Sequence, residues 1–247
     1  MQKFVTENGI EIPAVTASQM REIDRIAMEE TGPNLFQMME NAGRNLASLA
    51  IELLGRKWHK AKIIVLTGTG GNGGGGICAA RHLANRNIDV GLCISNPQKI
   101  VQVPQFQHKI YQNTQGKELK PNQLNNAKFD LIIDALIGYS LRNSPTGVIS
   151  ALIQWANQTT TPVLSLDVPS GLDATTGEAP GNFIHARWTL TLALPKTGLR
   201  PEITGDLYLG DIGIPQKTYK TIGLNYCSPF GTGYFVRLKS SPLSEGV

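Results

Sequence analysis

Seven glycines lie within the nine residues from Gly68 to Gly76, directly after the β-branched run Ile63–Val65. Glycine lets backbone N–H groups approach a ligand closely, and the start of a helix favours negative charge. A glycine turn between a buried strand and a helix therefore predicts a phosphate-bearing ligand, most simply a nucleotide. The competing interpretation is a glycine-rich surface loop without a ligand, and the flanking strand and helix argue against it.

Two carboxylates, Asp134 and Asp167, each end an apolar stretch that is typical of a strand. Such a residue either caps a turn or belongs to a site. The carboxyl ends of parallel strands share one edge of the sheet, where ligands bind in open α/β folds, so both aspartates and the glycine turn are expected there. Ser170 lies close enough to Asp167 for its hydroxyl to reach the same place. Oxygen groups such as Asp134, Ser170 and the Asn72 amide suit a hard cation better than zinc.

The segments that position these residues alternate between strand-like and helix-like patterns, which predicts parallel strands joined by crossover helices. The expected fold class is α/β, a three-layer Rossmann-like sandwich with a mostly parallel central sheet and helices on both faces. The predicted strands are 62–66, 90–94, 131–134, 163–166 and 189–194, and the predicted helices are 77–85, 105–112 and 148–157.

Two further helices are predicted ahead of the first of these strands. Thr16 and Gln19 have the spacing of a capping box, and apolar residues then recur at helical spacing up to residue 27 and again over 34–54. A sheet covered on both faces by its own crossovers leaves this apolar surface to be buried elsewhere. We therefore predict that residues 16–54 pack outside the sheet or form part of a homodimer interface. The alternative is that they cap the sheet edge within one subunit.

Composition and charge narrow the function classes. The chain has 247 residues, 41% of them hydrophobic, and a net charge of +4, as expected for one soluble α/β domain. No Lys/Arg block is long enough for a nucleic-acid surface and no apolar stretch approaches membrane-spanning length, so neither partner is expected. Cys78, Cys93 and Cys227 fit neither a disulfide framework nor a zinc site, and the four histidines lack ligand spacing. These features favour a reduced, cytoplasmic protein.

A dehydrogenase is the first function to consider, because a G-x-G-x-x-G spacing begins at Gly68. That fingerprint requires an acidic residue at the end of the second strand to hold the ribose. Here the second strand runs into Ser95 and Asn96, and Asp89 lies at its start, at the opposite edge of the sheet. The GK[ST] ending of a phosphate-binding P-loop is absent as well. Both readings are therefore disfavoured.

Six segments, in order and at natural spacing, together resemble the NAD(P)H-hydrate epimerase family, the YjeF N-terminal domain. They are residues 16–26, MENAGR at 39–44, the glycine turn with AARHL at 79–83, LDVPSGLD at 166–173, ALPKTG at 193–198 and DIGIP at 211–215. The resemblance covers residues 12–216. It implies that residues 1–247 form a single domain of this type, with 217–247 as a C-terminal extension.

The resemblance implies a function, an ion and a set of contacts. The function is epimerisation of the R and S forms of hydrated NADH and NADPH, a repair of damaged nicotinamide cofactor, in which Asp167 is the best available acid/base. The ion is potassium, with Asn72, Asp134 and Ser170 as ligands, and a separate dehydratase is the implied functional partner. The substrate-binding residues that the family carries over are Gly71, Asn72, Gly73, Gly74, Gly75, Gly138, Tyr139, Ser140, Leu141, Arg142, Asn143, Ser144 and Asp167.

The chain also departs from the family pattern. The family's turn reads G-x-G-N-N-G-G-D-G, whereas Gly71 here replaces its first Asn and Gly75 its Asp. Tyr139 stands where the family's D-A-L-F-G-T-G-L has Thr, and it either stacks on a ring of the ligand or blocks the pocket. Because of these changes, a catalytically inactive nucleotide-binding or scaffold module of the same fold is the alternative function. Some relatives serve as such scaffolds in RNA-decay complexes.

Overall fold

The computed structural model describes residues 3–240. The strands are β1 (Lys3–Thr6), β2 (Glu11–Pro13), β3 (Lys62–Thr67), β4 (Asp89–Ile94), β5 (Lys117–Glu118), β6 (Leu131–Ala135), β7 (Val163–Leu166), β8 (Trp188–Leu192), β9 (Asp206–Gly210) and β10 (Phe235–Ser240). The α-helices are α1 (Ala17–Ile26), α2 (Leu35–Leu54), α3 (Gly71–Ala84), α4 (Gln102–Tyr111), α5 (Gly147–Gln158), α6 (Pro201–Thr204) and α7 (Gln216–Thr221). A π-helical turn, η1 (Ala27–Thr31), follows α1, and the 3-10 turns are η2 (Gly55–Lys60), η3 (Pro97–Lys99) and η4 (Pro121–Asn126).

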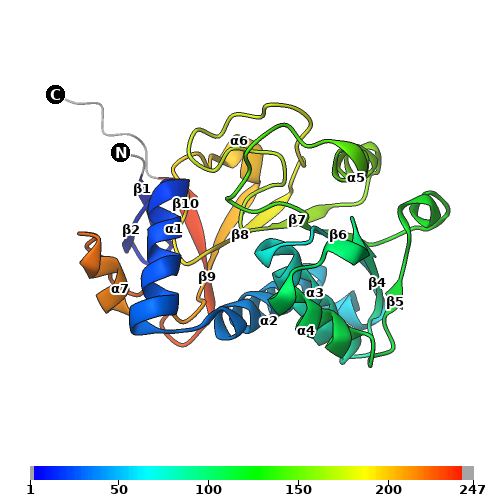
Figure 1. The fold of residues 1–247 in the computed structure, drawn as a ribbon, viewed down its shortest axis with the longest axis horizontal. Coiled ribbons are helices and arrows are strands. Elements are labelled where there is room, and N and C mark those ends of the chain that lie inside the picture. Colours follow the sequence, from blue (N-terminus) through cyan, green and yellow to red (C-terminus); the bar gives the residue numbers. More distant parts are fainter. Residues whose placement is uncertain (1–2, 241–247) are drawn as a thin grey trace.

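All ten strands form one sheet, in the order β2-β1-β10-β9-β8-β7-β6-β3-β4-β5 (Figure 1). The neighbours from β9 to β5 are parallel, and β10, β1 and β2 continue the sheet as antiparallel strands at one end. In the middle of the parallel part, Val65 on β3 lies opposite Leu92 on β4 and Ile133 on β6. The predicted mostly parallel sheet is therefore confirmed.

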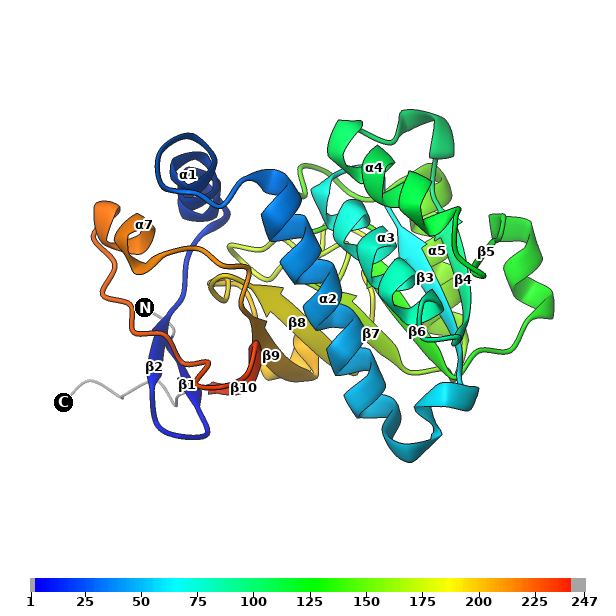
Figure 2. The same ribbon diagram turned by 90° about the horizontal axis from the view of Figure 1, so that it is seen from below.

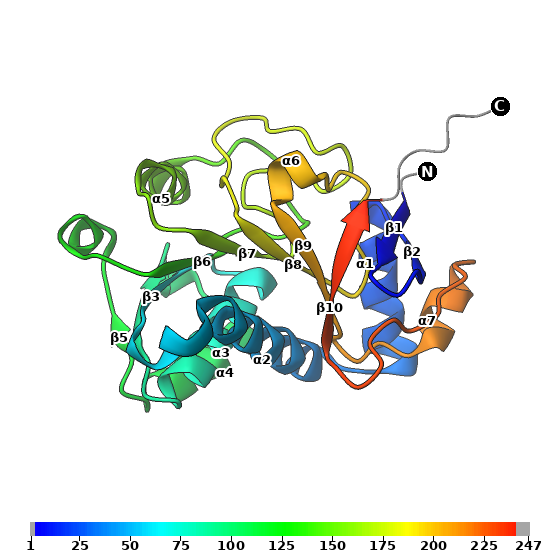
Figure 3. The same cartoon turned by 180° about the vertical axis from the view of Figure 1, so that it is seen from behind.

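Alternate residues of β3 face opposite layers of the molecule, as a pleated strand requires. Ile63 and Val65 pack into the core under α2 and α3, whereas Ile64 and Leu66 pack with Leu152 of α5 on the other face. Figure 2 shows α2, α3 and α4 side by side over one face, and Figure 3 shows α5 on the opposite face. The predicted three-layer architecture is confirmed.

The two helices that precede β3 bury their apolar faces within this chain. Leu46 and Leu49 of α2 belong to the same core cluster as Ile63, so α2 is one of the helices that cover the sheet. The prediction that residues 16–54 pack outside the sheet is therefore wrong for α2. Met20 and Ile23 of α1 pack into a second core cluster with the antiparallel strands. The prediction assumed that the crossover helices alone cover both faces of the sheet. In the structure α2 lies beside α3 and α4 over one face and completes its cover (Figure 2).

Both helices begin at capping boxes. Thr16 accepts a hydrogen bond from the Gln19 N–H at 3.2 Å, and its own N–H donates to the Gln19 side chain at 2.9 Å, as predicted. Asn34 and Gln37 make the same reciprocal pair at the start of α2, at 3.1 and 2.9 Å. Each pair satisfies backbone N–H groups that have no partner inside the helix.

Helix α3 begins at Gly71, six residues before the predicted start at residue 77. Glycine is a poor helix former, so the sequence favoured a loop here. Packing requires the opposite, because a Cβ atom at Gly76 would lie 2.5 Å from the Cβ of Ala135, and one at Gly74 would lie 2.5 Å from the sulfur of Met39. The glycines therefore let the helix lie directly on β6 and against α2.

Other differences from the predicted elements are one early strand end and five additional strands. Strand β8 ends at Leu192, two residues early, because Ala193 adopts a left-handed φ of +61°. Strands β1, β2, β5, β9 and β10 were not predicted. Of the predicted C-terminal extension, 217–247, β10 is an integral strand of the sheet, and residues 241–247 lie outside the described part. Among residues 3–240, no helix combines the length and the apolar character needed to cross a membrane.

Candidate active site

Strands β7, β6 and β3 are parallel neighbours, so the segments that follow them meet at one edge of the sheet. A cavity of about 260 Å³ lies at this edge. Its polar lining comes from Asp24, Asn72, Tyr139, Ser140, Asp167 and Lys196, and its apolar walls come from Met20, Leu35, Met38, Met39, Ala42, Leu166, Leu192 and Ile212. The predicted convergence of the glycine turn and the two strand ends is therefore found.

Asp167 lines this cavity from the end of β7. The residue has a φ of +68°, a left-handed conformation that few non-glycine residues adopt and that is concentrated at functional sites. Its carboxylate accepts hydrogen bonds from the backbone N–H groups of Tyr139 and Leu192, each at 3.2 Å. Only 3% of the residue is exposed. The carboxylate is thus fixed in one orientation at the cavity wall.

Lys196 forms an ion pair with Asp167, and the lysine is only 1% exposed. The ammonium group also donates to the Leu192 carbonyl oxygen at 2.9 Å and to the Thr191 hydroxyl at 3.4 Å. A buried charge requires such a partner, because transfer of an unpaired ion out of water is very costly. Lys196 was not predicted as a site residue, although it belongs to the ALPKTG segment at 193–198 on which the family resemblance rests.

Asp134 and Ser170 form a second, fully buried polar group, and neither residue lines the cavity. The two oxygens of Asp134 accept hydrogen bonds from the Ser170 hydroxyl at 2.6 Å, the Ser170 N–H at 2.9 Å, the Ser165 hydroxyl at 2.8 Å and the Leu136 N–H at 3.2 Å. Burial nevertheless raises the pKa of Asp134, with these hydrogen bonds acting against the rise. All four donors belong to the loops after β6 and β7 or to β7 itself, so Asp134 connects these loops.

The N-terminus of α3 faces the cavity. Among the described residues, no side chain caps this helix at Gly70, and both Gly71 and Asn72 line the cavity. An uncapped helix N-terminus offers free N–H groups and a favourable dipole to an anion. A Cβ at Gly71 would meet nothing within 4 Å, whereas one at Gly75 would lie 2.8 Å from a methyl group of Leu166. The family's Asn therefore fits here without change, and its Asp requires Leu166 to move.

The structure gathers part of the predicted substrate-binding set around the cavity. The residues that line it are Gly71, Asn72, Gly75, Gly138, Tyr139, Ser140 and Asp167. Gly73 and Gly74 are buried inside α3, and Asn143 and Ser144 are exposed. Leu141 and Arg142 line a separate surface hollow together with Asp173. The helical start at Gly71 accounts for the first difference, because positions 71, 72 and 75 share one face of the helix, whereas Gly73 and Gly74 lie on other faces.

Tyr139 lines the cavity, and its side chain is anchored to α1. Its hydroxyl donates a hydrogen bond to Asp24 on α1 at 2.5 Å, and its ring lies 5.8 Å from the Lys196 ammonium. Burial and the neighbouring Asp24 carboxyl raise the pKa of the Tyr139 hydroxyl. Asp24 was not predicted as a site residue, because it belongs to a helix expected to lie outside the sheet. Tyr139 thus connects α1 to the loop after β6.

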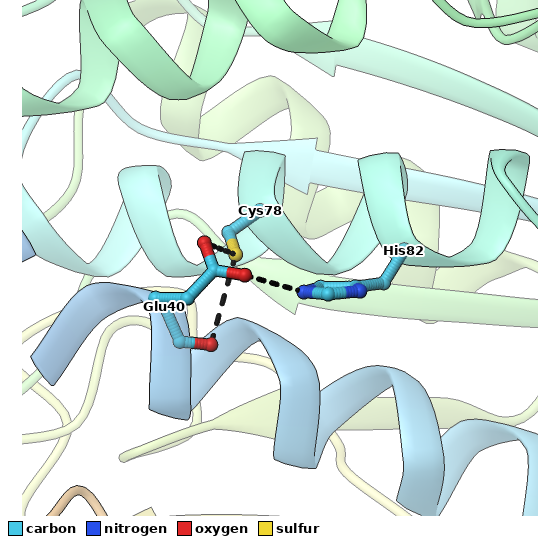
Figure 4. A group of neighbouring side chains, drawn as sticks. All are labelled: Glu40, Cys78 and His82. Carbon is cyan, nitrogen blue, oxygen red and sulfur yellow. Dashed lines mark hydrogen bonds and ion pairs between the residues drawn. The ribbon is translucent and has the colours of Figure 1, made fainter. Parts of the chain in front are cut away.

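A separate cluster joins α2 to α3 outside the cavity (Figure 4). The carboxylate of Glu40, the thiol of Cys78 and the ring of His82 offer potential ligand atoms that lie within 4.8 Å of one another. Arg81 lies among them, with its Nη2 atom 2.5 Å from Glu40, 3.3 Å from the Cys78 sulfur and 3.4 Å from His82. The space between the three side chains thus holds a guanidinium cation. We interpret the cluster as an ion-pair network that fastens the two helices.

This network gives a pH dependence of stability. Burial would raise the pKa of Glu40, but hydrogen bonds from Arg81 and His82 outweigh it and hold that pKa at about 2, against 4.5 in an unfolded chain. A lowered carboxyl pKa adds stability above pH 4.5 that is lost as the pH falls towards 2. We expect Glu40→Gln to lower the free energy of unfolding by about 1–2 kcal/mol at pH 7, a value reduced by partial exposure, and to flatten this acid loss.

Urea unfolding of the wild type and Glu40→Gln at pH 7 and pH 3 measures this effect. The matched control is Glu30→Gln, because Glu30 forms a surface ion pair with Arg25 at 3.1 Å. We expect the control to change the free energy of unfolding by less than about 0.5 kcal/mol at both pH values. Equal effects of the two substitutions would contradict the role assigned to Glu40.

The chain is similar in sequence to a known protein family and to several of its members. The family model described as YjeF-related protein N-terminus matches residues 35–198. The chain is 49% identical to an NAD(P)H-hydrate epimerase from Dehalogenimonas lykanthroporepellens, over 97% of this chain and 98% of that relative. It is 36% identical to the bifunctional NAD(P)H-hydrate repair enzyme Nnr from Moorella thermoacetica, over 85% of this chain and 42% of the relative.

One further relative and one solved structure also match this chain. The chain is 32% identical to the enhancer of mRNA-decapping protein 3 from Macaca fascicularis, over 97% of this chain and 47% of that protein. The crystal structure of the yeast protein YNL200c matches with a TM-score of 0.79 at 22% identity, over 92% of this chain and 100% of that one, which supports the fold. The family match covers more than half of the chain, including β3, β6 and β7 and the loops that line the cavity. The chain therefore belongs to the YjeF-related protein N-terminus family.

Proposed function

We propose that this protein is an NAD(P)H-hydrate epimerase, which interconverts the R and S forms of hydrated NADH and NADPH. The observation that carries the proposal is the 49% identity with an NAD(P)H-hydrate epimerase along nearly the full length of both chains. The cavity supports it, because a buried carboxylate–ammonium pair lies beside the uncapped N-terminus of α3. A dinucleotide substrate needs both features, one for the reacting ring and one for its phosphates.

Asp167 is the residue to which we assign proton transfer. The hydrated carbon of the ring bears a hydroxyl group and the ring nitrogen, so it inverts either by loss and return of the hydroxyl or by opening and closure of the ring. Both routes move protons at that carbon, and a positioned carboxylate accelerates such a step. Asp167 lines the cavity with its carboxylate held by two N–H groups and by Lys196. We propose that the diphosphate of the substrate binds at Gly71 and Asn72.

The test is the rate at which purified S and R epimers of hydrated NADPH interconvert, followed by chromatography with and without the protein. We expect the protein to bring the mixture to equilibrium faster than buffer does. Calorimetry with the same nucleotide measures binding separately. Binding without acceleration would favour the alternative function, a catalytically inactive scaffold. Two observations support that alternative, namely the similarity to the mRNA-decapping protein and the glycines at positions 71 and 75.

We further propose a potassium site formed by Asn72, Asp134 and Ser170. All three offer oxygen ligands, which suit a hard monovalent cation. The Asn72 amide oxygen faces the loop after β6, because a Cβ at Gly138 would lie 3.1 Å from it, and Asp134 with its bonded Ser170 hydroxyl stands at the end of the same strand. The amide oxygen of Asn72, the carboxylate of Asp134 and the hydroxyl oxygen of Ser170 are the atoms that would hold the ion. When bound, potassium would neutralise nearby phosphate charge and order the loops.

Replacement of potassium by tetramethylammonium at constant ionic strength is expected to lower both the melting temperature and the affinity for the nucleotide. Thermal unfolding and calorimetry measure the two effects. In the Asn72→Ala variant, which leaves the Asp134–Ser170 hydrogen bonds in place, the dependence on potassium should disappear. Identical behaviour of the wild type in both salts would exclude the site.

We also propose a homodimer, a functional pairing with a separate dehydratase, and a cytoplasmic location. Phe36 on α2 and Phe106 on α4 are 44% and 51% exposed and make an edge-to-face contact with ring centroids 5.3 Å apart, which supports a dimer surface at this end of residues 16–54. A relative that aligns with this chain over 42% of its own length is named a bifunctional NAD(P)H-hydrate repair enzyme, so a second activity accompanies the matching region in that protein. Three free cysteines suit a reducing compartment.

A further inference from the structure

We propose that Asp24 is a second catalytic carboxyl group of the cavity, which donates a proton to the substrate while Asp167 accepts one. The proposal rests on the epimerase function and adds a second group to it. Asp24 lines the cavity from α1, whereas Asp167 lines it from the end of β7. The two carboxyl groups therefore reach the same space from different parts of the fold.

Tyr139 links the two carboxyl groups. Its hydroxyl donates to Asp24 at 2.5 Å, and its backbone N–H donates to Asp167 at 3.2 Å. One residue in the loop after β6 thus fixes both groups relative to each other. Preorganised groups of this kind are what proton transfer between a substrate and two side chains needs.

The surroundings of the two carboxyl groups differ in charge. Asp167 is paired with the Lys196 ammonium, whereas the ion pairs among the described residues include none that involves Asp24. Burial raises the pKa of Asp24, and the Tyr139 hydrogen bond and Lys196 act against that rise. The other groups near Asp24 are Asp167, which adds to the rise, and Tyr219 on α7.

Two carboxyl groups with opposed environments commonly divide the roles of acid and base in an enzyme. Asp24 has the environment of the neutral acid, and Asp167 has that of the ionised base. The positive charge of Arg21, which lies on the same helix as Asp24, acts against the rise in the pKa of the Tyr139 hydroxyl. The cationic partner of the cavity, Lys196, is engaged by Asp167.

Both routes of inversion use one donor and one acceptor. In the hydroxyl-loss route, Asp24 protonates the hydroxyl, the C–O bond breaks with its electron pair on the departing water, and the nitrogen lone pair forms a C=N bond. Water then adds to the opposite face, the C=N pair returns to nitrogen, and Asp167 takes the released proton. The reverse reaction exchanges the two roles, and proton exchange with water resets them. No electrons are gained or lost.

The ring-opening route has the same requirement. Asp167 takes the hydroxyl proton as the O–H pair forms a C=O bond, the C–N bond breaks with its pair on nitrogen, and Asp24 protonates that nitrogen. Rotation and closure on the other face then reverse each transfer. A single carboxyl group would have to perform the two transfers one after the other.

A purely structural role for Asp24 is the competing explanation, since its hydrogen bond holds Tyr139. Two variants separate the roles. Asp24→Asn keeps an acceptor for the Tyr139 hydroxyl but has no acidic proton, whereas Tyr139→Phe removes the hydrogen bond and keeps the carboxyl group. We expect Asp24→Asn to lower kcat by about 10²-fold or more, and Tyr139→Phe to lower it less than about tenfold.

The pH profile and a third variant complete the experiment. The wild-type kcat should fall as the pH rises through the pKa of Asp24, and this limb should be absent in Asp24→Asn. Asp24→Glu should recover part of the rate, and thermal unfolding and nucleotide calorimetry confirm that each variant folds and binds. An active wild type with Asp24→Asn within tenfold of it, or with equal losses in Asp24→Asn and Tyr139→Phe, would overturn the proposal. A wild type no faster than buffer would instead overturn the epimerase function itself.

Discussion

Replacement of Asp167 by Asn is expected to lower the rate of epimerisation by about 10²–10⁴-fold, the usual contribution of a positioned acid or base. Asn has one acceptor oxygen in place of two, so it can keep the hydrogen bond from the Tyr139 N–H or the one from the Leu192 N–H, because these groups donate to different carboxylate oxygens. The Asn side chain cannot take up a proton at neutral pH. The expected loss is therefore in kcat, and the measurement is the initial rate of conversion of one pure epimer into the other.

The control for this variant is Asp173→Asn. Asp173 accepts hydrogen bonds from the N–H groups of Thr175 and Thr176, each at 2.8 Å, as the carboxylate of a turn outside the cavity. We expect its rate to stay within a few-fold of the wild type. Calorimetry with the nucleotide shows whether Asp167→Asn still binds. A well-folded Asp167→Asn protein that retains more than a tenth of the wild-type rate would argue against Asp167 as the acid/base.

Removal of the Lys196 ammonium is expected to cause the largest loss of stability. Lys196→Met leaves the Asp167 carboxylate buried without a counter-charge, and breakage of a buried ion pair from one side costs about 3–5 kcal/mol. The double variant Asp167→Asn with Lys196→Met removes both charges and should be more stable than the sum of the two single changes predicts. Urea unfolding of the four proteins gives the coupling free energy directly.

An exposed lysine provides the comparison for Lys196→Met. Lys99 lies on the surface in η3, and Lys99→Met should change the free energy of unfolding by less than about 0.5 kcal/mol. If the effects of the two single substitutions at 167 and 196 simply add, the buried pair does not stabilise this fold in the way we infer.

Local patterns in the sequence were sufficient to predict the layers and one side of the site. Alternating apolar strands and helices indicated the parallel sheet, and the positions of Asp134 and Asp167 at strand ends placed them at one edge, because parallel strands share the direction of their carboxyl ends. Asn72 and Gly71 followed from the glycine turn. Each of these inferences needs only the strand that directly precedes the residue.

Lys196 and Asp24 could not be found in that way. Lys196 reaches Asp167 because the chain reverses at Ala193, whose left-handed φ no sequence pattern indicated, and its ammonium group returns to the Leu192 carbonyl. Asp24 enters the cavity because α1 packs beside the antiparallel strands β1, β2 and β10. None of these three strands was predicted. Both contacts depend on the packing of elements distant in sequence, and short-range periodicity carries no information about that packing.

The glycines of α3 show the same limit for secondary structure. Intrinsic propensity costs about 1 kcal/mol for each glycine in a helix, so residues 71–76 favour a loop when considered alone. The close contact of Gly76 with β6 and of Gly74 with α2 reverses this preference. Tertiary packing therefore decided where this helix starts.

The two ends of the sheet protect the protein from aggregation. One outer strand, β5, has two residues, and the other, β2, has three and ends at Pro13, which has no N–H to offer a further strand. Without the β1–β2 hairpin, the backbone of β10 would lose its partner along Leu238 to Ser240 and could recruit a strand from another molecule. The hairpin therefore covers a strand edge that could otherwise pair with another molecule.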